Sequence, residues 1–308
     1  MKIRSSNMPS WHKIRSSCTD RSPGRIAVLM MISRLCAVAL ACGLTACAPL
    51  QTPVTYSDTS RIDLLQQLLP VDAILLGEQH DAPDHQQVHR VVVSTLASQN
   101  ALAALTLEMA SQGQSTINLS PDASEEAVRT ALQWNNEGWP WAAYGPAVMA
   151  AVRAGVPVMG ANLPRARMRD AMANTELDRL LSGPALEAQQ QDIRTGHCGK
   201  LPESQIAPMT RIQIARDMAM AQTVTQAAHD GKTVVLLAGG GHVDRMLGVP
   251  LHTAPTLKLK AVLIRSEPVT QEASAASSFD AIWPAQAAPA LDYCARFDET
   301  RRPLATPP

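Results

Sequence analysis

Glutamate and histidine side chains follow short apolar runs in this sequence of 308 residues. A run that starts at Ile74 leads through glycine to Glu78 and His80, and a run that starts at Val235 leads through three glycines to His242. Carboxylates and imidazoles can ligate a metal ion, transfer protons or pair with each other in a buried network. These residues are therefore the first candidates for a functional site.

Two further apolar runs end in polar residues. Ala101–Leu107 ends at Glu108, and Val156–Gly160 ends just before Asn162. Such runs predict strands that are buried on both faces, and ligands of open α/β sheets bind beyond the carboxyl ends of the strands. We therefore expect the polar groups at all four ends to converge on one site. A purely structural hydrogen-bond network is the alternative, because buried polar groups need partners in any case.

Helical periodicity separates the expected strands. It predicts helices over 61–69 and from Pro83 to Leu96, and the alternation of strand and helix predicts parallel pairing with right-handed crossovers. Further strands are expected over 258–265 and 279–283. The helices expected between residues 111 and 230 outnumber those that one layer over a sheet requires, which indicates a helical subdomain.

Three histidines and a glutamate lie within twelve residues. His85 and His89 are spaced i,i+4 on the expected helix, and Glu78 and His80 precede them. Imidazole with carboxylate suits zinc, manganese or iron, but the glutamate that follows the first histidine of zinc proteases is missing. The alternative is that these histidines lie at the surface or in the first turn of the helix.

Two other features have an open interpretation. Trp134, Trp139, Trp141 and Tyr144 lie within eleven residues and form either a wall for a flat apolar ligand or the core of a helical subdomain. The glycines at 239–241 lack the spacing of a dinucleotide-binding motif. They permit either a close approach of the backbone to a ligand or a plain tight turn.

The N-terminal segment predicts export. Residues 1–46 contain seven Lys and Arg and one Asp, and the apolar run Leu35–Leu44 is too short to span a bilayer. The sequence Leu-Thr-Ala before Cys47 resembles a bacterial lipoprotein box, which implies cleavage before Cys47 and a lipid anchor. An ordinary secretory signal is the alternative. Residues 47–60 are expected to form a tether, 61–290 the folded domain, and 291–308 a C-terminal tail.

The remaining chain is mildly acidic, with 20 Lys and Arg against 26 Asp and Glu after residue 46. No basic patch is expected, so nucleic acid is excluded as a partner. Besides Cys47, the only cysteines after residue 46 are Cys198 and Cys294. In an oxidising compartment they are expected to form a disulfide, and two buried free thiols are the alternative.

Taken together and in order, these motifs resemble the ChaN-like haem-binding lipoproteins, within a wider group that includes Tiki-type proteins and erythromycin esterases. The resemblance extends from about residue 61 to 284. It rests on Leu76–Asp81 with His85, Leu107–Met109 with Gln112, Trp141 and Tyr144, Asn162–Arg165, His197–Gly199, Arg216–Ala219, Ala238–His242 and Gly248–Pro250.

The resemblance implies a three-layer α/β/α core with a mostly parallel sheet and a helical insertion at about 111–152 and 165–230. It implies a haem cofactor held between two subunits of a homodimer, with a tyrosine and a histidine near the iron. It also implies attachment to the outer membrane of a Gram-negative envelope, facing the periplasm, and a role in haem or iron acquisition with a possible haem transport system.

The resemblance implies a tyrosine ligand but does not fix its position. The only tyrosines are Tyr56 in the tether, Tyr293 beside Cys294, and Tyr144. Tyr144 lies among the tryptophans and is therefore the expected axial ligand, with His80 and His85 as other candidate ligands of iron or a metal. The expected cofactor contacts are Tyr144, Trp141, Asn162, Arg165 and His197, and Arg167 is a further candidate for a haem propionate.

The enzymes of the wider group imply a different function. Such enzymes hydrolyse their substrates with Glu and His at strand ends, and Glu78, His80, Glu108 and His242 are all present here. A manganese, cobalt or zinc ion between them would activate water. Without a metal, a histidine would act as the general base. Whether the protein is an enzyme stays open at this point.

Overall fold

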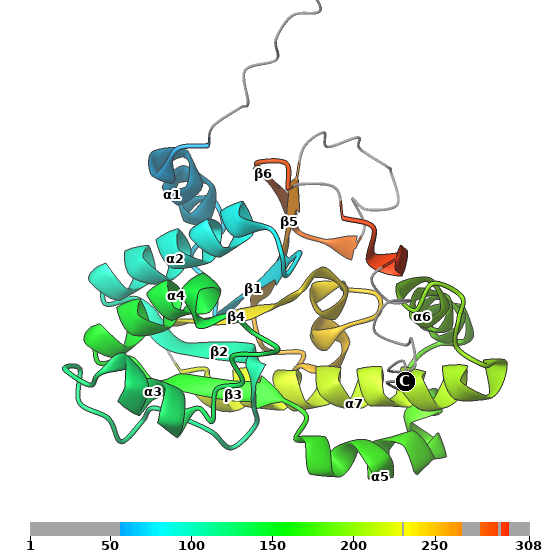
Figure 1. The fold of residues 1–308 in the computed structure, drawn as a ribbon. Coiled ribbons are helices and arrows are strands. Elements are labelled where there is room, and N and C mark those ends of the chain that lie inside the picture. The colour runs from blue at the N-terminus through cyan, green and yellow to red at the C-terminus, as the bar shows by residue number, and fades with distance from the viewer. Residues whose placement is uncertain (1–55, 230, 267–277, 289–290, 296–308) are drawn as a thin grey trace, which may run out of the picture. The chain divides into compact units, whose positions relative to one another are not determined.

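Six parallel strands form the centre of the fold (Figure 1). They lie in the order β3-β2-β4-β1-β5-β6, and every neighbouring pair is parallel. The expected strands are all present, and the expected α/β class is confirmed. The strands are β1 (Ala73–Glu78), β2 (Leu102–Ser111), β3 (Val158–Asn162), β4 (Thr233–Gly239), β5 (Leu259–Ser266) and β6 (Ala281–Ala285).

The computed structural model describes residues 56–229, 231–266, 278–288 and 291–295. The expected signal peptide, Cys47 and most of the expected tether therefore lie outside the described residues. The tether was expected to extend to residue 60, but the first helix already begins at Asp58, because the Ser57 side chain accepts a hydrogen bond from the Ser60 backbone and caps it.

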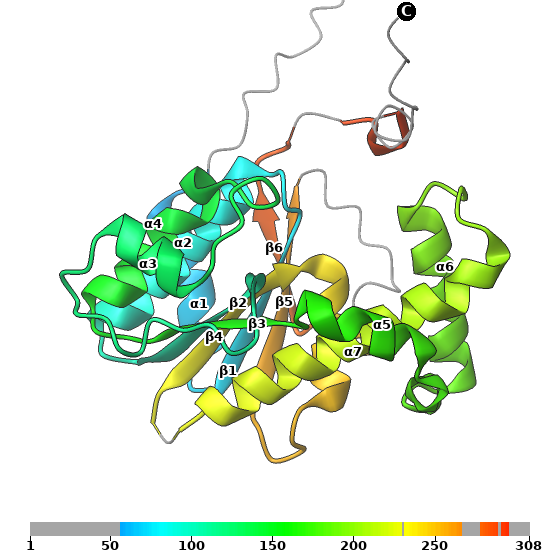
Figure 2. The same cartoon turned by 60° about the horizontal axis from the view of Figure 1, so that its bottom comes forward.

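Helices cover both faces of the sheet (Figures 1 and 2). Apolar side chains of each strand alternate between the two layers, so that Leu76 and Leu237 join one core, and Leu75 and Leu236 join the other. The first core lies under α1 (Asp58–Gln66), α2 (Pro83–Ser98), α3 (Glu125–Ala131) and α4 (Trp141–Arg153), and the second lies under α7 (Glu203–Ala227).

The remaining helices extend beyond the sheet next to α7 (Figure 2). A third, smaller apolar cluster joins Leu163, Leu177 and Ile214 there. The helical insertion expected from the sequence is therefore divided between two places. Its first part, with α3 and α4, covers one face of the sheet, and its second part lies outside the sheet next to α7. The outer part contains η1 (Arg165–Arg167), α5 (Met168–Ala173), η2 (Thr175–Arg179) and α6 (Gly183–Gly196).

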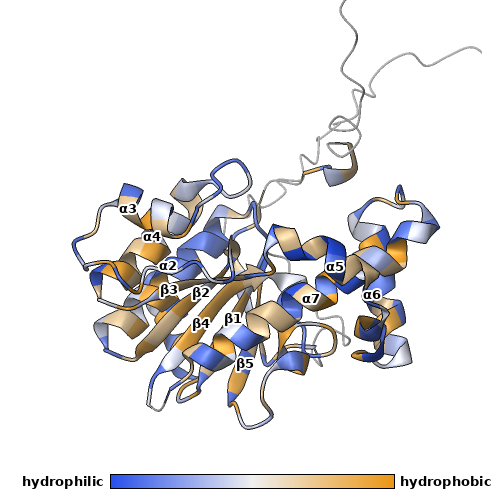
Figure 3. Ribbon diagram, turned by 90° about the horizontal axis from the view of Figure 1, so that it is seen from below, coloured by the Kyte–Doolittle hydropathy of each residue, from blue (hydrophilic) through white to orange (hydrophobic). Residues whose placement is uncertain are grey.

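Polarity follows this arrangement (Figure 3). The strands are coloured as mostly hydrophobic, whereas the helices carry mixed surfaces. Strands buried on both faces leave few places for charged groups, so the charges of the sheet gather at the carboxyl ends of the strands. In the described part of the chain, no helix is both long enough and apolar enough to cross a bilayer.

Candidate functional site

Glu78, the last residue of β1, is the centre of a buried polar cluster. Its side chain is fully buried, and it points toward the layer of α2 and α4. Oε1 accepts hydrogen bonds from the Tyr144 hydroxyl at 2.5 Å and from His80 Nδ1 at 2.8 Å, and Oε2 accepts one from Gln86 Nε2 at 2.9 Å. Three donors therefore satisfy a carboxylate that burial alone would destabilise.

Glu108 forms a second centre on the opposite face of the sheet. Its Oε1 accepts a hydrogen bond from Arg216 Nη2 at 2.9 Å, and its Oε2 accepts one from the Gly239 backbone at 2.8 Å. Asn162 links the same residues, because its Nδ2 donates to the Glu108 carbonyl and its Oδ1 accepts from Arg216 Nε. The sequence places Glu108 after a strand, but β2 continues to Ser111.

His242 extends this second centre. Its Nε2 lies 3.4 Å from Glu108 Oε1, and its Nδ1 donates to Asp217 Oδ1 at 2.5 Å. Gln213 of α7 also contacts the imidazole ring. Arg216 and Asp217 were part of the family pattern but had no expected role in the site. Two adjacent charges inside an otherwise apolar stretch of a helix are the signal that identifies them.

His80 connects the two centres. Its Nδ1 contacts Glu78, its Nε2 lies 3.9 Å from Glu108 Oε2, and 42% of its side chain is exposed. The Trp139 ring packs edge-on against it, with ring centroids 4.7 Å apart. The structure therefore brings together Glu78, His80, Glu108, Asn162 and His242, with His80 as the accessible member of the group.

The topology explains this convergence. β1, β4 and β2 are adjacent strands, and around them the chain reverses the direction in which it adds strands to the sheet. In open α/β sheets this switch point is where ligands bind. Gly77 and Gly239 allow the loops to approach closely, because a Cβ at Gly77 would lie 2.3 Å from the Val243 side chain and one at Gly239 would lie 3.0 Å from His80 Nε2.

Charge pairing determines the protonation of the first centre. Burial alone would raise the pKa of Glu78, but the contacts with His80, His89 and Tyr144 outweigh burial and lower it. Burial alone would lower the pKa of His80, but the two carboxylates outweigh it and raise that pKa. His80 therefore carries a positive charge more readily than an ordinary histidine, next to two ionised glutamates.

The second centre shows larger shifts. Burial opposes the charge on His242, but Glu108 and Asp217 outweigh it and raise the pKa of His242 to about 10. The pKa of Glu108 is lowered strongly, because His242, His80 and Arg216 outweigh its burial. Burial raises the pKa of Asp217 to about 6. His242 is therefore an imidazolium between two carboxylates at neutral pH.

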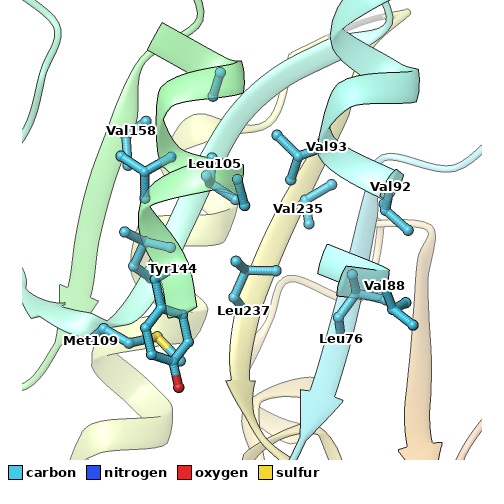
Figure 4. Packing of buried hydrophobic residues seen from close by; sticks show 14 of the residues in the cluster. Leu76, Val88, Val92, Val93, Leu105, Met109, Tyr144, Val158, Val235 and Leu237 are labelled. Carbon is cyan, nitrogen blue, oxygen red and sulfur yellow. The ribbon is translucent and has the colours of Figure 1, made fainter. Parts of the chain in front are cut away.

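The aromatic cluster is part of the core, which corrects the expectation for Tyr144 and Trp141. Tyr144 is 1% exposed and lies among Leu105, Met109 and Leu237 (Figure 4). Burial and Glu78 raise its pKa far above the ordinary value, so the phenol stays protonated. Trp141 is buried and donates to Glu125. The burial of both rings gives no support to a direct contact with haem.

His85 and His89 also have structural environments, which corrects the expectation that His85 ligates a metal. Both are 1% exposed. The Gln79 backbone donates to His85 Nδ1, and burial lowers the pKa of His85 to about 4. His89 lies 3.6 Å from Glu78 Oε2. Within the described ranges, no three His, Cys, Asp or Glu residues are arranged to hold a metal ion. The alternative of a bound manganese, cobalt or zinc ion therefore gains no support.

A disulfide joins Cys198, at the end of α6, to Cys294, with their Cα atoms 5.6 Å apart. His197 and Tyr293 directly precede the two cysteines, so the bond brings these two chain segments together. His197 is half-buried and hydrogen-bonds to the Ile193 carbonyl. Arg165 is exposed on η1, next to Asn162 in the sequence but on a separate element from His80.

Tyr293, which was set aside at the sequence level because it lies beside Cys294, lies next to the loop that carries His80. It is 51% exposed, and its hydroxyl donates to the Asp81 carboxylate, with oxygen distances of 2.7 and 2.8 Å. Gln79 Nε2 donates to the same hydroxyl at 3.0 Å. The phenol is therefore held on the loop that carries His80. The predicted disulfide is the signal that would have found it, since Tyr293 precedes Cys294.

Comparisons with known proteins identify the family and the fold of this chain. The sequence profile of the family described as "Haem-binding uptake, Tiki superfamily, ChaN" matches residues 64–253. A solved structure described as "Cofacial heme binding to ChaN of Campylobacter jejuni" has the same fold, with a TM-score of 0.60 and 22% identity over 73% of this chain and 92% of that one.

Two other solved structures are more distant. The type III effector HopBA1 has a TM-score of 0.46 and 15% identity over 77% of this chain and 97% of its own. A Bacillus cereus protein has a TM-score of 0.39 and 14% identity over 70% of this chain and 72% of its own. No curated protein matches this sequence significantly.

Proposed function

This chain belongs to the ChaN family of haem-binding uptake proteins in the Tiki superfamily, and we propose that it binds haem itself. The observation that carries the proposal is the family match, which covers residues 64–253 and so includes Glu78, Glu108 and His242. The expectation of membership in this family, made from the sequence motifs, is confirmed. Haem binding by this chain is the function that the match and the exposed groups of the site support best.

Two exposed side chains at the carboxyl edge of the sheet fit a haem. Tyr293 is 51% exposed and His80 has 42% of its side chain exposed. Both belong to one hydrogen-bonded loop region, since the Tyr293 hydroxyl contacts Gln79 and Asp81 on either side of His80. A tyrosinate is a natural ligand of ferric haem iron, and an imidazole ligates iron or donates a hydrogen bond. We assign Tyr293 as the iron ligand in place of Tyr144.

Asp81 prepares the Tyr293 oxygen for this role. Its carboxylate already accepts the phenolic hydrogen, so it can take the proton when the oxygen turns toward a ferric iron. Gln79 donates to the same oxygen and limits its orientation. Bound haem would supply the metal centre, and Asp81 and Gln79 would deprotonate and position Tyr293, its ligand.

A homodimer would complete such a site. Both side chains are exposed to solvent, His80 by 42% and Tyr293 by 51%. Haem bound at them would therefore have one face in water. A second copy of the chain covering that face would exclude the water, and cofacial haem binding is described for the Campylobacter jejuni relative.

We also propose a location and a physiological role. The Leu-Thr-Ala-Cys sequence ending at Cys47 supports a lipid anchor after removal of residues 1–46, at the outer membrane and facing the periplasm. In that position the protein would receive haem for iron acquisition, together with a haem transport system. Cys47→Ser should move the protein from the membrane fraction to the soluble fraction, and unchanged membrane association would refute the anchor.

A haem titration of the purified protein tests the central proposal. We expect a saturable Soret shift with a defined stoichiometry, and a spectrum typical of oxygen-ligated ferric haem. A linear, featureless increase in absorbance, like that of haem added to protein-free buffer with detergent, would contradict haem binding. The Tyr144→Phe variant should give the same spectrum as the unchanged protein, because that phenol is buried.

A further inference from the structure

Two adjoining cavities lie beside α7, away from His80 and Tyr293. The first, which we name the helix cavity, has a volume of about 280 Å³ and lies between α5 and α7. The second, which we name the amide cavity, has a volume of about 350 Å³ and lies between α7, β3 and the loop after β2. Gln112, Arg167 and Gln222 line both cavities, so the two lie on either side of these three side chains.

The helix cavity has an apolar wall. Leu163, Ala171 and Leu177 line it and belong to the third apolar cluster of the fold, and the 39% exposed Met218 side chain also lines it. An exposed methionine is a flexible apolar surface that adapts to different shapes. An aliphatic group that enters this cavity would be removed from water, which favours binding roughly in proportion to the apolar area buried.

The amide cavity is polar, and its charged lining residue is positive. The carboxamides of Gln112, Gln114, Gln222 and Gln226 line it together with the Arg167 guanidinium, and no acidic side chain does. Asp170, by contrast, lines only the helix cavity. Gln112 already donates to Ala219, Gln222 and Thr223. The Arg167 guanidinium, supported by the amide groups of the other glutamines, therefore favours an anionic group in the amide cavity.

Arg167 differs from the arginines of the neighbouring helix. Arg211 is paired with Asp178, and Arg216 is paired with Glu108. The Arg167 side chain makes no hydrogen bond or ion pair with any residue that the structure describes. A guanidinium has a planar set of donors that matches an oxyanion in two-point contact, so an unpaired one between two cavities is suited to anchor a ligand.

The orientation of α7 keeps these cavities separate from the haem site. Arg216 and Asp217 point to Glu108 and His242. Met218 and Gln222, on another side of the same helix, line the cavities. A ligand in the cavities would therefore leave the exposed His80 surface open.

We infer that the two cavities bind an amphiphilic oxyanion, with its charged head against Arg167 in the amide cavity and its aliphatic tail in the helix cavity. A carboxylate with a medium-length alkyl chain is the simplest ligand of this class. The charge of the amide cavity and the apolar wall of the helix cavity together set the orientation, and neither property comes from the haem site.

Methyl NMR with decanoate tests the inference on the intact protein carrying labelled methionine methyl groups. Met218 lines the helix cavity and Met159 lines the amide cavity, so both methyl signals should shift saturably as decanoate is added. Decyltrimethylammonium, with a similar tail and the opposite charge, should not produce these shifts. Absence of saturable shifts with decanoate, or equal shifts with the cation, would overturn the inference.

Two arginine variants provide the matched comparison. Arg167→Gln should raise the dissociation constant of decanoate about tenfold or more, because a charge-assisted hydrogen bond is lost. Arg165→Gln, on the same short helix but lining neither cavity, should change it less than twofold. Equal effects of the two variants would refute the role of Arg167. Decanoate binding is measured on haem-free protein, so failure of the haem proposal would not affect this result.

Discussion

The imidazolium of His242 is held between Glu108 and Asp217 in the interior of the protein. Removing one member of such a group leaves the others charged and unpaired, which costs more than the pair itself contributes. His242 is therefore important for stability whatever ligand the protein binds. Its charge also makes that stability depend on pH.

His242→Gln should lower the free energy of unfolding by about 3–5 kcal/mol at pH 6, measured by chemical denaturation. The folded pKa of about 10 lies above the ordinary value of 6.5, so the stabilisation is fully present below pH 6.5 and is lost as the pH rises to 10. The difference between variant and unchanged protein should therefore shrink between pH 6.5 and 10.

His229→Gln is the matched control, because His229 is exposed. It should change the free energy of unfolding by less than about 0.5 kcal/mol at either pH. A difference between the His242 variant and the unchanged protein that stays constant from pH 6 to 10 would show that His242 is uncharged in the folded state.

At this scale the sequence predicts which polar residues gather at the strand ends better than it predicts what each residue does. Glu78, His80, Glu108 and His242 were found because each follows an apolar run. The burial of Tyr144 could not be predicted, because its tryptophan neighbours fit a ligand wall and a core equally well, and only packing distinguishes these two cases. Tyr293 was set aside because it lies beside Cys294, and its contacts with Gln79 and Asp81, more than 200 residues earlier in the chain, could not be predicted.

At the scale of elements, the loop after β4 positions His242. It contains η3 (Gly240–Val243) and η4 (Val249–His252), and Gly248 lies against the backbone of the first of these short helices. A Cβ on Gly248 would lie 2.2 Å from the His242 carbonyl oxygen, whereas one on Gly241 would meet nothing within 4 Å. A side chain at position 248 therefore requires the loop to move, whereas a side chain at position 241 does not.

Gly248→Ala should lower the free energy of unfolding by about 1–3 kcal/mol, because the loop must move to accommodate the methyl group. Gly241→Ala should change it by less than about 0.5 kcal/mol. Thermal denaturation of both variants measures this. A Gly248 variant as stable as the Gly241 variant would show that the loop relaxes freely around His242.

The disulfide fixes the segment with Tyr293 to the end of α6. It joins residues 96 positions apart, so it removes much conformational freedom from the unfolded chain. Cys198→Ser and Cys294→Ser should each lower the free energy of unfolding by about 2–4 kcal/mol and weaken haem binding. The double variant should resemble either single variant, since one bond is lost in all three. Additive losses would contradict a shared bond.

The strands were more predictable than the helices. Continuous apolar runs identify buried strands without knowledge of their neighbours. The helices between the strands then predict that the strands are parallel. The role of α7 could not be predicted in the same way. Its residues serve the sheet, the polar cluster and the third apolar cluster, and which side of the helix faces which of these depends on the complete packing.

At the scale of the whole molecule, the open position of His80 and Tyr293 predicts that haem and dimerisation are coupled. A ligand bound by two subunits stabilises the dimer by mass action. Sedimentation velocity of the protein at micromolar concentration should therefore show a shift from monomer to dimer as haem is added. Saturable haem binding with an unchanged sedimentation coefficient would refute a site shared between subunits.

Haem spectroscopy of Tyr293→Phe, with Tyr144→Phe as control, tests the account most directly. If Tyr293 ligates the iron, its variant should lose the absorption and resonance Raman bands of tyrosinate-ligated ferric haem and bind haem more weakly, while the control keeps the unchanged spectrum. Loss of those bands in Tyr144→Phe but not in Tyr293→Phe, or no haem binding by any of the three proteins, would contradict it.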